Sequence, residues 1–288
     1  MIVGIATRGR PLILGETIAD LARQSRPADR IVVSYAEQAD IGDAARHFPQ
    51  VCFVPAELGL TRQRNAILEQ AQDADVLLFL DDDFYLDRDY LSVLEQLFAE
   101  QQEVAVATGR VLADGINGAG LASAEARAML AGGREAAADV ASAPVFNAYG
   151  CNMALRMSPV RQHGLRFDEL LPLYGWWEDV DFSRQMARYG SVVLLTTAVG
   201  VHLGAKSGRT SGVRLGYSQV ANPIYLARKG TVPWSHALPN IWLRVLKNVV
   251  KSLAPEPYVD RRGRLRGNLI ACRELVTGKL CPLRALDL

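Results

Sequence analysis

One apolar segment that runs into three acids constrains this chain most. Residues 76–80, Val-Leu-Leu-Phe-Leu, contain no polar side chain and are followed directly by Asp81, Asp82 and Asp83. Such a run predicts a β-strand that is buried on both faces, as in a parallel sheet. Ligands of these sheets gather at the carboxyl ends of the strands, so we expect the three carboxylates to meet a cation there.

Short apolar segments alternate with amphipathic ones in the first part of the chain. Apolar residues spaced three and four apart predict helices, for example around Leu14 and Ile18 and around Ile67 and Leu68. This alternation indicates an α/β fold with a Rossmann-like, mostly parallel central sheet flanked by helices. Strands are predicted at residues 2–6, 30–34, 51–54, 76–80, 104–109, 149–155, 192–195 and 199–203.

The segment at residues 114–143 has a different composition. It is rich in Ala and Gly and shows little apolar periodicity apart from a short helix predicted at residues 122–130. Long segments of this kind are either mobile or functional.

The overall composition is that of a globular protein with a substantial core. The chain has 288 residues, of which 49% are hydrophobic, and this length predicts one or two domains. No apolar run approaches the roughly 20 residues needed to cross a bilayer, and the start lacks the features of a signal peptide, so we expect a cytoplasmic protein. The four cysteines lie far apart, which argues against a zinc knuckle or a disulfide framework.

The charge is distributed unevenly. The formal net charge is only +1, which argues against a protein that binds nucleic acid with its whole surface. Residues 229–288 nevertheless contain eleven Lys and Arg and four Asp and Glu, a net charge of +7. We therefore divide the chain into a main domain, residues 1–230, and a basic helical tail, residues 231–288.

The tail contains a predicted amphipathic helix at residues 234–253. Its apolar residues recur every three or four positions, and the cations Arg244, Lys247 and Lys251 lie off that stripe. Together with the basic run at residues 261–266, this helix suits an anionic membrane surface, contacted through residues 234–266. It would equally suit packing on the main domain or on a second subunit.

The acidic triplet at residues 81–83 allows several interpretations. Oxygen-rich sites hold Mg²⁺ or Mn²⁺, which keep open positions for substrate phosphates. A phosphate-loop ATPase would need a G-x-x-x-x-G-K-[ST] run and a dinucleotide-binding protein a G-x-G-x-x-G run, and the sequence contains neither after its first strand. Capping of the next helix, or simple exposure to water, would explain an isolated triplet as well.

A second cluster combines Trp176 and Trp177 with Glu178 and Asp179. The aromatic rings suit the apolar face of a sugar. Helical spacing at residues 180–189 places the two acids at a helix amino end, where the dipole favours the ionised carboxylate that a base requires. Core tryptophans beside an ordinary helix cap are the alternative explanation.

Taken in order, these segments resemble family-two glycosyltransferases of the GT-A fold, which move a sugar from a nucleotide diphosphate to a hydroxyl. The resemblance covers about residues 2–204, with a donor-binding half at about 1–110 and an acceptor half at about 145–204. The matching pattern is Ile-Ala-Thr-Arg-Gly-Arg-Pro at residues 5–11, Gly-Leu-Thr-Arg-Gln-Arg-Asn at 59–65, Leu-Asp-Asp-Asp at 80–83, Gly-Cys-Asn-Met-Ala at 150–154, Phe-Asp-Glu at 167–169, Trp-Glu-Asp-Val-Asp at 177–181, Arg184 and Gly190.

The resemblance implies a donor site with a divalent metal ion, Mn²⁺ or Mg²⁺. Asp83 and His202 would bind the metal. The residues implied in contacts with the donor or its nucleotide are Thr7, Arg10, Ser34, Arg64, Asp81 and, in a supporting role, Asp82. Many relatives carry an Asp where this chain has Ser34, which leaves the nucleotide open, with UDP preferred over dTDP or GDP.

The resemblance also implies the acceptor side. Asp179 would be the catalytic base and Glu178 would position the acceptor hydroxyls, so that attack inverts the anomeric centre. The residues expected in acceptor binding are Trp176, Trp177 and Asn152. Separately from the resemblance, the segment at residues 206–210 predicts a flexible loop after His202, and we expect its cations Lys206 and Arg209 to close over the diphosphate once the donor is bound.

The expected function is metal-dependent glycosyl transfer in polysaccharide or glycoconjugate synthesis. The expected partners are a nucleotide-sugar donor and a glycan or lipid-linked glycan acceptor, with the enzyme cytoplasmic or peripheral on the inner face of the cell membrane. A non-catalytic sugar-binding or nucleotide-binding module of the same fold is the main alternative. A nucleotidyltransferase is weaker, because its glycine-rich opening loop is absent.

Overall fold

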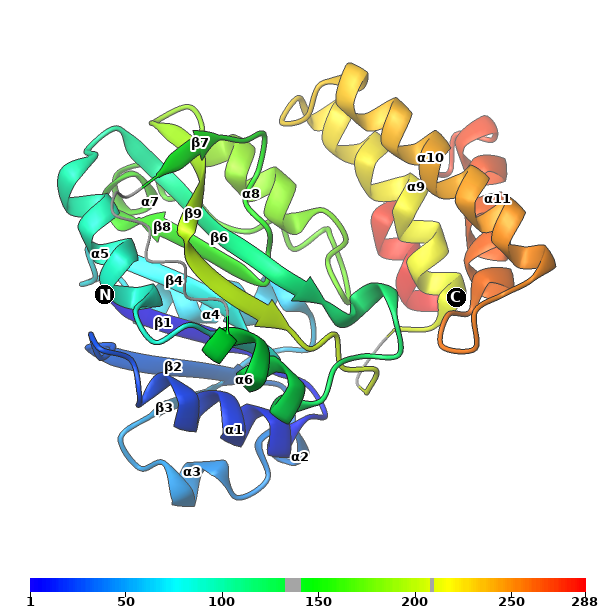
Figure 1. Ribbon diagram of the computed structural model, residues 1–288. Coiled ribbons are helices and arrows are strands. Elements are labelled where there is room, and N and C mark those ends of the chain that lie inside the picture. The colour runs from blue at the N-terminus through cyan, green and yellow to red at the C-terminus, as the bar shows by residue number, and fades with distance from the viewer. Residues whose placement is uncertain (133–140, 208–209) are drawn as a thin grey trace.

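The protein folds into an α/β unit followed by a group of C-terminal helices (Figure 1). The computed structural model describes residues 1–132, 141–207 and 210–288. The predicted α/β architecture with a C-terminal helical extension is confirmed.

A mixed sheet forms the centre of the α/β unit. Its strands follow the order β3 (Cys52–Pro55), β2 (Arg30–Tyr35), β1 (Ile2–Ala6), β4 (Val76–Asp81), β8 (Asn152–Arg156), β6 (Val104–Asp114), β9 (Ser191–His202) and β5 (Phe84–Leu86), and β7 (Ser142–Pro144) pairs with β9. The first four strands are parallel, and so are β6 and β9. Strands β8, β5 and β7 run antiparallel to their neighbours.

Helices cover the two faces of the sheet. They are α1 (Pro11–Leu21), α2 (Gln38–Ile41), α3 (Ala44–His47), α4 (Leu60–Gln70), α5 (Tyr90–Glu100), α6 (Ser123–Gly132), α7 (Met157–His163) and α8 (Glu178–Met186), with a 3₁₀ turn at Gly115–Asn117. Alternate residues of β4 enter opposite cores: Leu78 and Leu80 pack with α1 and α5, whereas Leu77 and Phe79 pack with α4 and α8. This strand is therefore buried on both faces, as its apolar run predicts.

Strand register brings distant polar residues to one edge of the sheet. Ala6 at the end of β1 pairs with Asp81 at the end of β4, and Asp114 at the end of β6 pairs with His202 at the end of β9. Asn152, at the start of the antiparallel strand β8, pairs with Leu80. The acids at the end of β4 therefore share an edge with polar residues from three other strands, β6, β8 and β9.

The C-terminal helices have a core of their own. They are α9 (Gly212–Lys229), α10 (Trp234–Leu253), α11 (Arg261–Val276) and a 3₁₀ helix at Pro282–Asp287. Helices α9 and α11 approach closely through glycines, since a Cβ at Gly216 would lie 2.0 Å from the Arg264 carbonyl oxygen and one at Gly267 would lie 2.1 Å from that of Val213. No helix in the described ranges is both long enough and apolar enough to cross a membrane.

Helix α10 confirms the predicted helix at residues 234–253, but much of its apolar stripe points to solvent. The exposed fractions are 70% for Trp242, 60% for Leu246 and 84% for Leu253. The polar Asn248 is instead buried, where it contacts side chains of α9 and α11. The helix therefore packs on its neighbours with a narrow mixed face, Ala237, Ile241, Val245 and Asn248, and leaves the rest of its apolar stripe exposed.

The predicted strands and helices occur with modest shifts. The two strands predicted at residues 192–195 and 199–203 form one bent strand, β9, whose register with β6 shifts between Gly109 and Arg110. The helix predicted at residues 180–189 starts earlier, at Glu178, and the one predicted at 122–130 corresponds to α6. Part of the Ala- and Gly-rich segment, residues 133–140, lies outside the described residues.

Candidate active site

Two acids from β4 and one histidine from β9 form a cluster suited to a metal ion. One ligand atom from each of Asp81, Asp83 and His202 lies within 4.8 Å of the other two. His202 Nε2 is 3.4 Å from Asp83 Oδ1 and 3.8 Å from Asp81 Oδ2. The turn after β4 leads into β5, whose Phe84 pairs with His202, and this pairing holds the histidine opposite the acids. Two carboxylates and an imidazole are a ligand set that fits Mn²⁺ or Mg²⁺.

Asp114 orients the histidine. Its Oδ1 lies 2.9 Å from His202 Nδ1, and its Oδ2 accepts a hydrogen bond of 3.0 Å from the Tyr149 hydroxyl. The ring nitrogen Nε2 is therefore the one directed at Asp81 and Asp83, which is the arrangement that carboxylates impose on metal-binding histidines. Although burial lowers the pKa of His202, the hydrogen bonds to Asp114 and Asp83 raise it to about 10.

Arg10 offsets the charge of the acidic triplet, and Thr7 donates a hydrogen bond to it. Arg10 places one guanidinium nitrogen 3.0 Å from Asp82 Oδ1 and another 3.0 Å from Asp83 Oδ2. Thr7 is buried and its hydroxyl donates to Asp82 Oδ2 at 2.6 Å. Burial raises the pKa of Asp82 to about 7, whereas the contacts with His202 and Arg10 outweigh burial and lower that of Asp83 to about 2. Asp83 is thus ionised more completely at neutral pH than Asp82.

The second acidic pair, Glu178 and Asp179, opens helix α8. Asp179 Oδ2 accepts from the Gly150 backbone at 3.0 Å, and its Oδ1 accepts from the Val180 backbone at 2.8 Å. Burial raises the pKa of both carboxyl groups. Gly150 leaves little space beside them, since a Cβ there would lie 3.1 Å from Glu178 Oε1 and 3.3 Å from Asp179 Oδ2.

A buried arginine connects the two groups of acids. Arg64 on α4 donates to Glu178 Oε1 at 2.9 Å and to the Gly150 carbonyl at 2.7 Å, and it lies 3.6 Å from Asp81 Oδ1. Its guanidinium also lies over the rings of Phe79 and Phe167, 5.4 and 5.5 Å from their centres. Arg64 therefore links the acids of the candidate metal site to the pair Glu178 and Asp179.

The loop before α8 is held in an unusual conformation. Leu173 and Trp177 have φ angles of +60° and +73°, which residues other than glycine rarely adopt. Contacts with α4 support the loop, because the Leu60 backbone donates to the Leu173 carbonyl at 2.8 Å and the Thr61 hydroxyl to the Leu171 carbonyl at 3.2 Å. Strain of this kind is common at functional sites.

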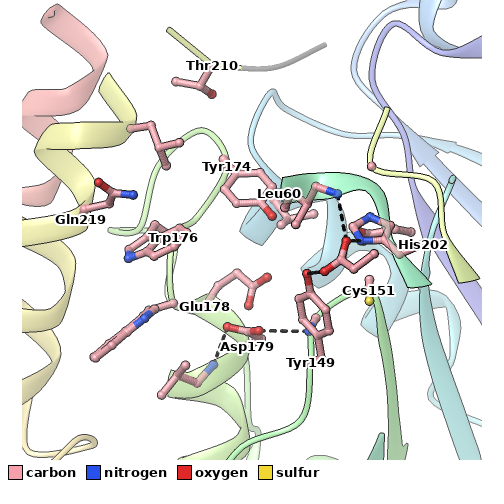
Figure 2. Close-up of a pocket in the computed structure, with 18 of the residues that line it drawn as sticks. Leu60, Tyr149, Cys151, Tyr174, Trp176, Glu178, Asp179, His202, Thr210 and Gln219 are labelled. Carbon is pink, nitrogen blue, oxygen red and sulfur yellow. Dashed lines mark hydrogen bonds and ion pairs between the residues drawn. The ribbon is translucent and has the colours of Figure 1, made fainter. Parts of the chain in front are cut away.

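Both groups of acids face one cavity of about 590 Å³. Figure 2 shows Glu178 and Asp179 between the strand end that carries His202 and the C-terminal helix that carries Gln219. Trp176 lines the cavity as well. The helices α9, α10 and α11 contribute the residues Gln219, His236, Asn240, Arg244, Lys247, Arg261 and Arg264 to its wall.

The remaining residues singled out from the sequence occupy different places. Ser34 and Asn152 are fully buried, and the Asn152 side chain contacts Thr108 and the Gly109 carbonyl. Trp177 lines the cavity and packs beside His236. Lys206 donates to the carbonyls of residues 115 and 116. Arg209 lies outside the described residues.

Two features of the site were not predicted from the sequence. One is Asp114, and the other is a cationic wall of the cavity formed by Arg244, Lys247, Arg261 and Arg264. Asp114 follows a predicted strand without any motif, so only its register with His202 reveals it. The sequence indicates the basic tail but not its position against the cavity.

Comparisons with known proteins agree with this geometry. The sequence model of glycosyl transferase family 2 matches residues 2–164. No curated protein matches the chain.

Several solved structures share the fold. S. aureus TarS 1–349 in complex with UDP-GlcNAc is 15% identical with a TM-score of 0.54, and the match covers 92% of this chain and 78% of that one. GalNAc-T7 with UDP, GalNAc and Mn²⁺ is 12% identical with a TM-score of 0.61, over 97% of this chain but only 57% of that one. The mannosyltransferase PcManGT from Pyrobaculum calidifontis, in complex with GDP-Man and Mn²⁺, is 14% identical with a TM-score of 0.51, over 99% and 85%. These likenesses confirm the predicted GT-A fold.

Proposed function

Because the chain belongs to glycosyl transferase family 2, we propose that it transfers a sugar from a nucleotide diphosphate sugar to a hydroxyl, in the synthesis of a polysaccharide or glycoconjugate. One observation carries this proposal: the cluster of Asp81, Asp83 and His202 and the pair Glu178 and Asp179 face the same cavity. A UDP sugar is the preferred donor, ahead of dTDP and GDP sugars.

The donor diphosphate binds at the end of β4. Asp83 and His202, with Asp81 beside them, hold a divalent cation, Mn²⁺ or Mg²⁺. When bound, such an ion neutralises the charge that develops on a departing diphosphate. Arg10 lines the same part of the cavity, and its guanidinium can contact phosphate oxygens. Asp82 and Thr7 are both buried, and the hydrogen bond between them supports this arrangement from the protein interior.

Asp179 acts as the base. Its two backbone hydrogen bonds orient the carboxylate and favour its ionised form, which takes the proton of the acceptor hydroxyl as attack proceeds. Glu178, fixed by Arg64, positions the acceptor hydroxyls, and its Oε2 has no hydrogen-bond partner among the described residues. Trp176 provides an apolar surface for the sugar. Attack from the face opposite the diphosphate inverts the anomeric centre.

A donor screen followed by one substitution tests this proposal. Thermal unfolding is measured with UDP, dTDP and GDP sugars, with and without Mn²⁺, since a ligand of the native state raises the melting temperature. The proposal expects one donor to stabilise the protein in a Mn²⁺-dependent way. Asp179→Asn should then bind that donor normally while turnover falls by about 10²- to 10⁴-fold, the usual contribution of a general base. Full turnover in Asp179→Asn contradicts the assignment of the base, and the absence of turnover in the unmodified protein identifies a binding module instead.

The exposed face of α10 supports a membrane contact, by which the enzyme reaches a lipid-linked acceptor. Trp242, Leu246 and Leu253 present apolar surface to solvent. Cations lie beside them: Lys251 is exposed, and Arg262 is exposed and donates to the carbonyl of residue 252 at 3.3 Å. Apolar surface flanked by cations binds anionic lipid, which is enriched in the cytoplasmic leaflet.

Flotation with vesicles that contain anionic phosphatidylserine tests the membrane contact. Trp242→Ser with Leu246→Ser should abolish flotation. The control Leu12→Ser with Val276→Ser changes two exposed apolar residues elsewhere, 84% and 88% exposed, and should still float. Equal flotation of both double variants would show that α10 does not contact the lipid.

A further inference from the structure

The wall that the C-terminal helices contribute to the cavity is cationic. Arg244 and Lys247 come from α10, and Arg261 and Arg264 come from α11. Within residues 1–132, 141–207 and 210–288, neither Arg244 nor Lys247 has a carboxylate within ion-pair distance. Two cations thus face the cavity without an ion pair to a carboxylate in the described part of the protein, and the more distant charge of Glu256 only partly offsets that of Lys247.

Burial and neighbouring cations lower the pKa of both Arg244 and Lys247. Burial and the neighbouring charge of Arg261 lower the pKa of Arg244. Burial, Arg261 and Arg244 likewise lower the pKa of Lys247. Like charges held close together at the edge of a cavity favour the binding of an anion, which relieves their repulsion.

Arg261 shows that this wall is built and not a chance accumulation of surface charge. Its side chain is only 9% exposed, and Glu256 holds it with hydrogen bonds of 2.9 and 3.1 Å. A third hydrogen bond of 3.2 Å joins Arg261 to Asn248 Oδ1, and the Asn248 amide donates to Gln219 and Asn268 at 3.0 and 2.9 Å. Side chains from α9, α10 and α11 therefore fix the guanidinium at the cavity.

The cationic wall lies on the acceptor side of the site. The guanidinium of Arg244 stands over the ring of Trp176, 5.3 Å from its centre. In the sequence, Trp176 lies just before the pair Glu178 and Asp179 at the start of α8. The donor diphosphate is proposed to bind elsewhere, at the acids that end β4. An anion held by Arg244 would therefore lie beside Trp176, the surface proposed for the acceptor sugar.

We propose that Arg244, Lys247 and Arg261 bind a phosphate group carried by the acceptor substrate. Guanidinium forks match phosphate oxygens, and a lysine adds a point charge. The inference rests on the proposed function and adds the substrate class: the acceptor is a phosphate ester that also presents a free hydroxyl. The phosphate belongs either to a lipid-linked carrier or to a polyol phosphate chain.

Calorimetric titration of protein saturated with Mn²⁺ and UDP tests the inference, because the nucleotide then already occupies the donor site. The probes are farnesyl phosphate, glycerol 3-phosphate and, as a control without phosphate, farnesol. The variant Arg244→Gln with Lys247→Gln removes two cavity cations. Its matched control, Arg266→Gln with Arg273→Gln, removes two exposed cations of α11 that do not line the cavity.

We expect at least one phosphate probe to bind and farnesol to bind more weakly than farnesyl phosphate. The cavity variant should weaken phosphate binding about tenfold or more, in line with the loss of hydrogen bonds to a charged group, while the control variant keeps it. Tighter binding of farnesyl phosphate than of glycerol 3-phosphate indicates a lipid carrier, and the reverse indicates a polyol phosphate.

Three results overturn the inference. The first is that neither phosphate probe binds. The second is that the cavity variant binds the phosphate probes as tightly as the unmodified protein does. The third is that the cavity variant loses affinity for UDP and keeps its affinity for the probes. Failure of the proposed function is seen separately, as a protein that binds no nucleotide diphosphate with Mn²⁺; the probes are then titrated with Mn²⁺ alone, and the same criteria apply.

Discussion

Replacing Asp114 with Asn isolates the part that this carboxylate plays in holding His202. The Asp114 Oδ1 to His202 Nδ1 distance is 2.9 Å, and the backbone pairing of these residues between β6 and β9 does not depend on either side chain. Asn has nearly the same size, so the substitution removes charge and leaves the fold. Loss of an outer carboxylate of this kind costs about 10- to 100-fold in metal affinity. Because the Asp114 side chain is 24% exposed, water screens its charge, and we expect the lower end, about tenfold or about 1.4 kcal/mol.

Calorimetric titration with Mn²⁺ measures this loss. Tyr149→Phe is the control, because it removes the 3.0 Å hydrogen bond to the other carboxylate oxygen and keeps the contact with His202. In a His202→Ala background, Asp114→Asn should have little further effect, since its partner is already gone. If Asp114→Asn binds Mn²⁺ as tightly as the unmodified protein, or weakens binding equally with and without His202, Asp114 does not act through the histidine.

Three further predictions concern the acids and their supports. Burial raises the pKa of Asp179, and the proposed base must be ionised to act, so kcat/KM should be lost on acidification at a pH above the ordinary Asp pKa of about 3.9; an acidic limb at or below that value would count against Asp179. Gly150→Ala should lower turnover more than Mn²⁺ affinity, because its Cβ would crowd Glu178 and Asp179, while Gly118→Ala, with no atom within 4 Å, should be active; equal activity of both would show that the crowding is harmless. Arg64→Met should lower the free energy of unfolding by about 3–5 kcal/mol, since it leaves Glu178 buried without its partner; chemical denaturation showing the same small loss as Arg62→Met, at a half-exposed arginine on the same helix, would be inconsistent with that role.

The sequence predicted the α/β unit well because β4 and its neighbours are short, uninterrupted apolar runs. The direction of β8 could not be predicted, since a five-residue strand with three apolar residues at its centre has the same pattern whether it runs parallel or antiparallel. Helices α9 and α11 were not predicted either. Pro223 lies inside α9, and the glycines at 216 and 267 that weaken helix propensity are the residues that let the two helices approach.

The site, like the fold, could be predicted from the sequence only in part. The positions of Asp81, Asp83 and His202 follow from motifs at strand ends, whereas Asp114 requires the register between β6 and β9. The periodicity of α10 identified an apolar and a polar side but not which side packs. Here a narrow mixed face packs: Ala237, Ile241 and Val245 enter apolar clusters, and the buried Asn248 finds partners on α9 and α11. That packing is what brings Arg244 and Lys247 to the cavity.

Crystals grown with Mn²⁺ and UDP, with data collected at the manganese absorption edge, show whether Asp83 and His202 hold a divalent ion at the donor diphosphate. We expect an anomalous peak between the Asp83 carboxylate and His202 Nε2, in contact with the nucleotide diphosphate. A bound nucleotide with no peak there, or with a peak at other residues, would mean that these two residues do not hold the ion.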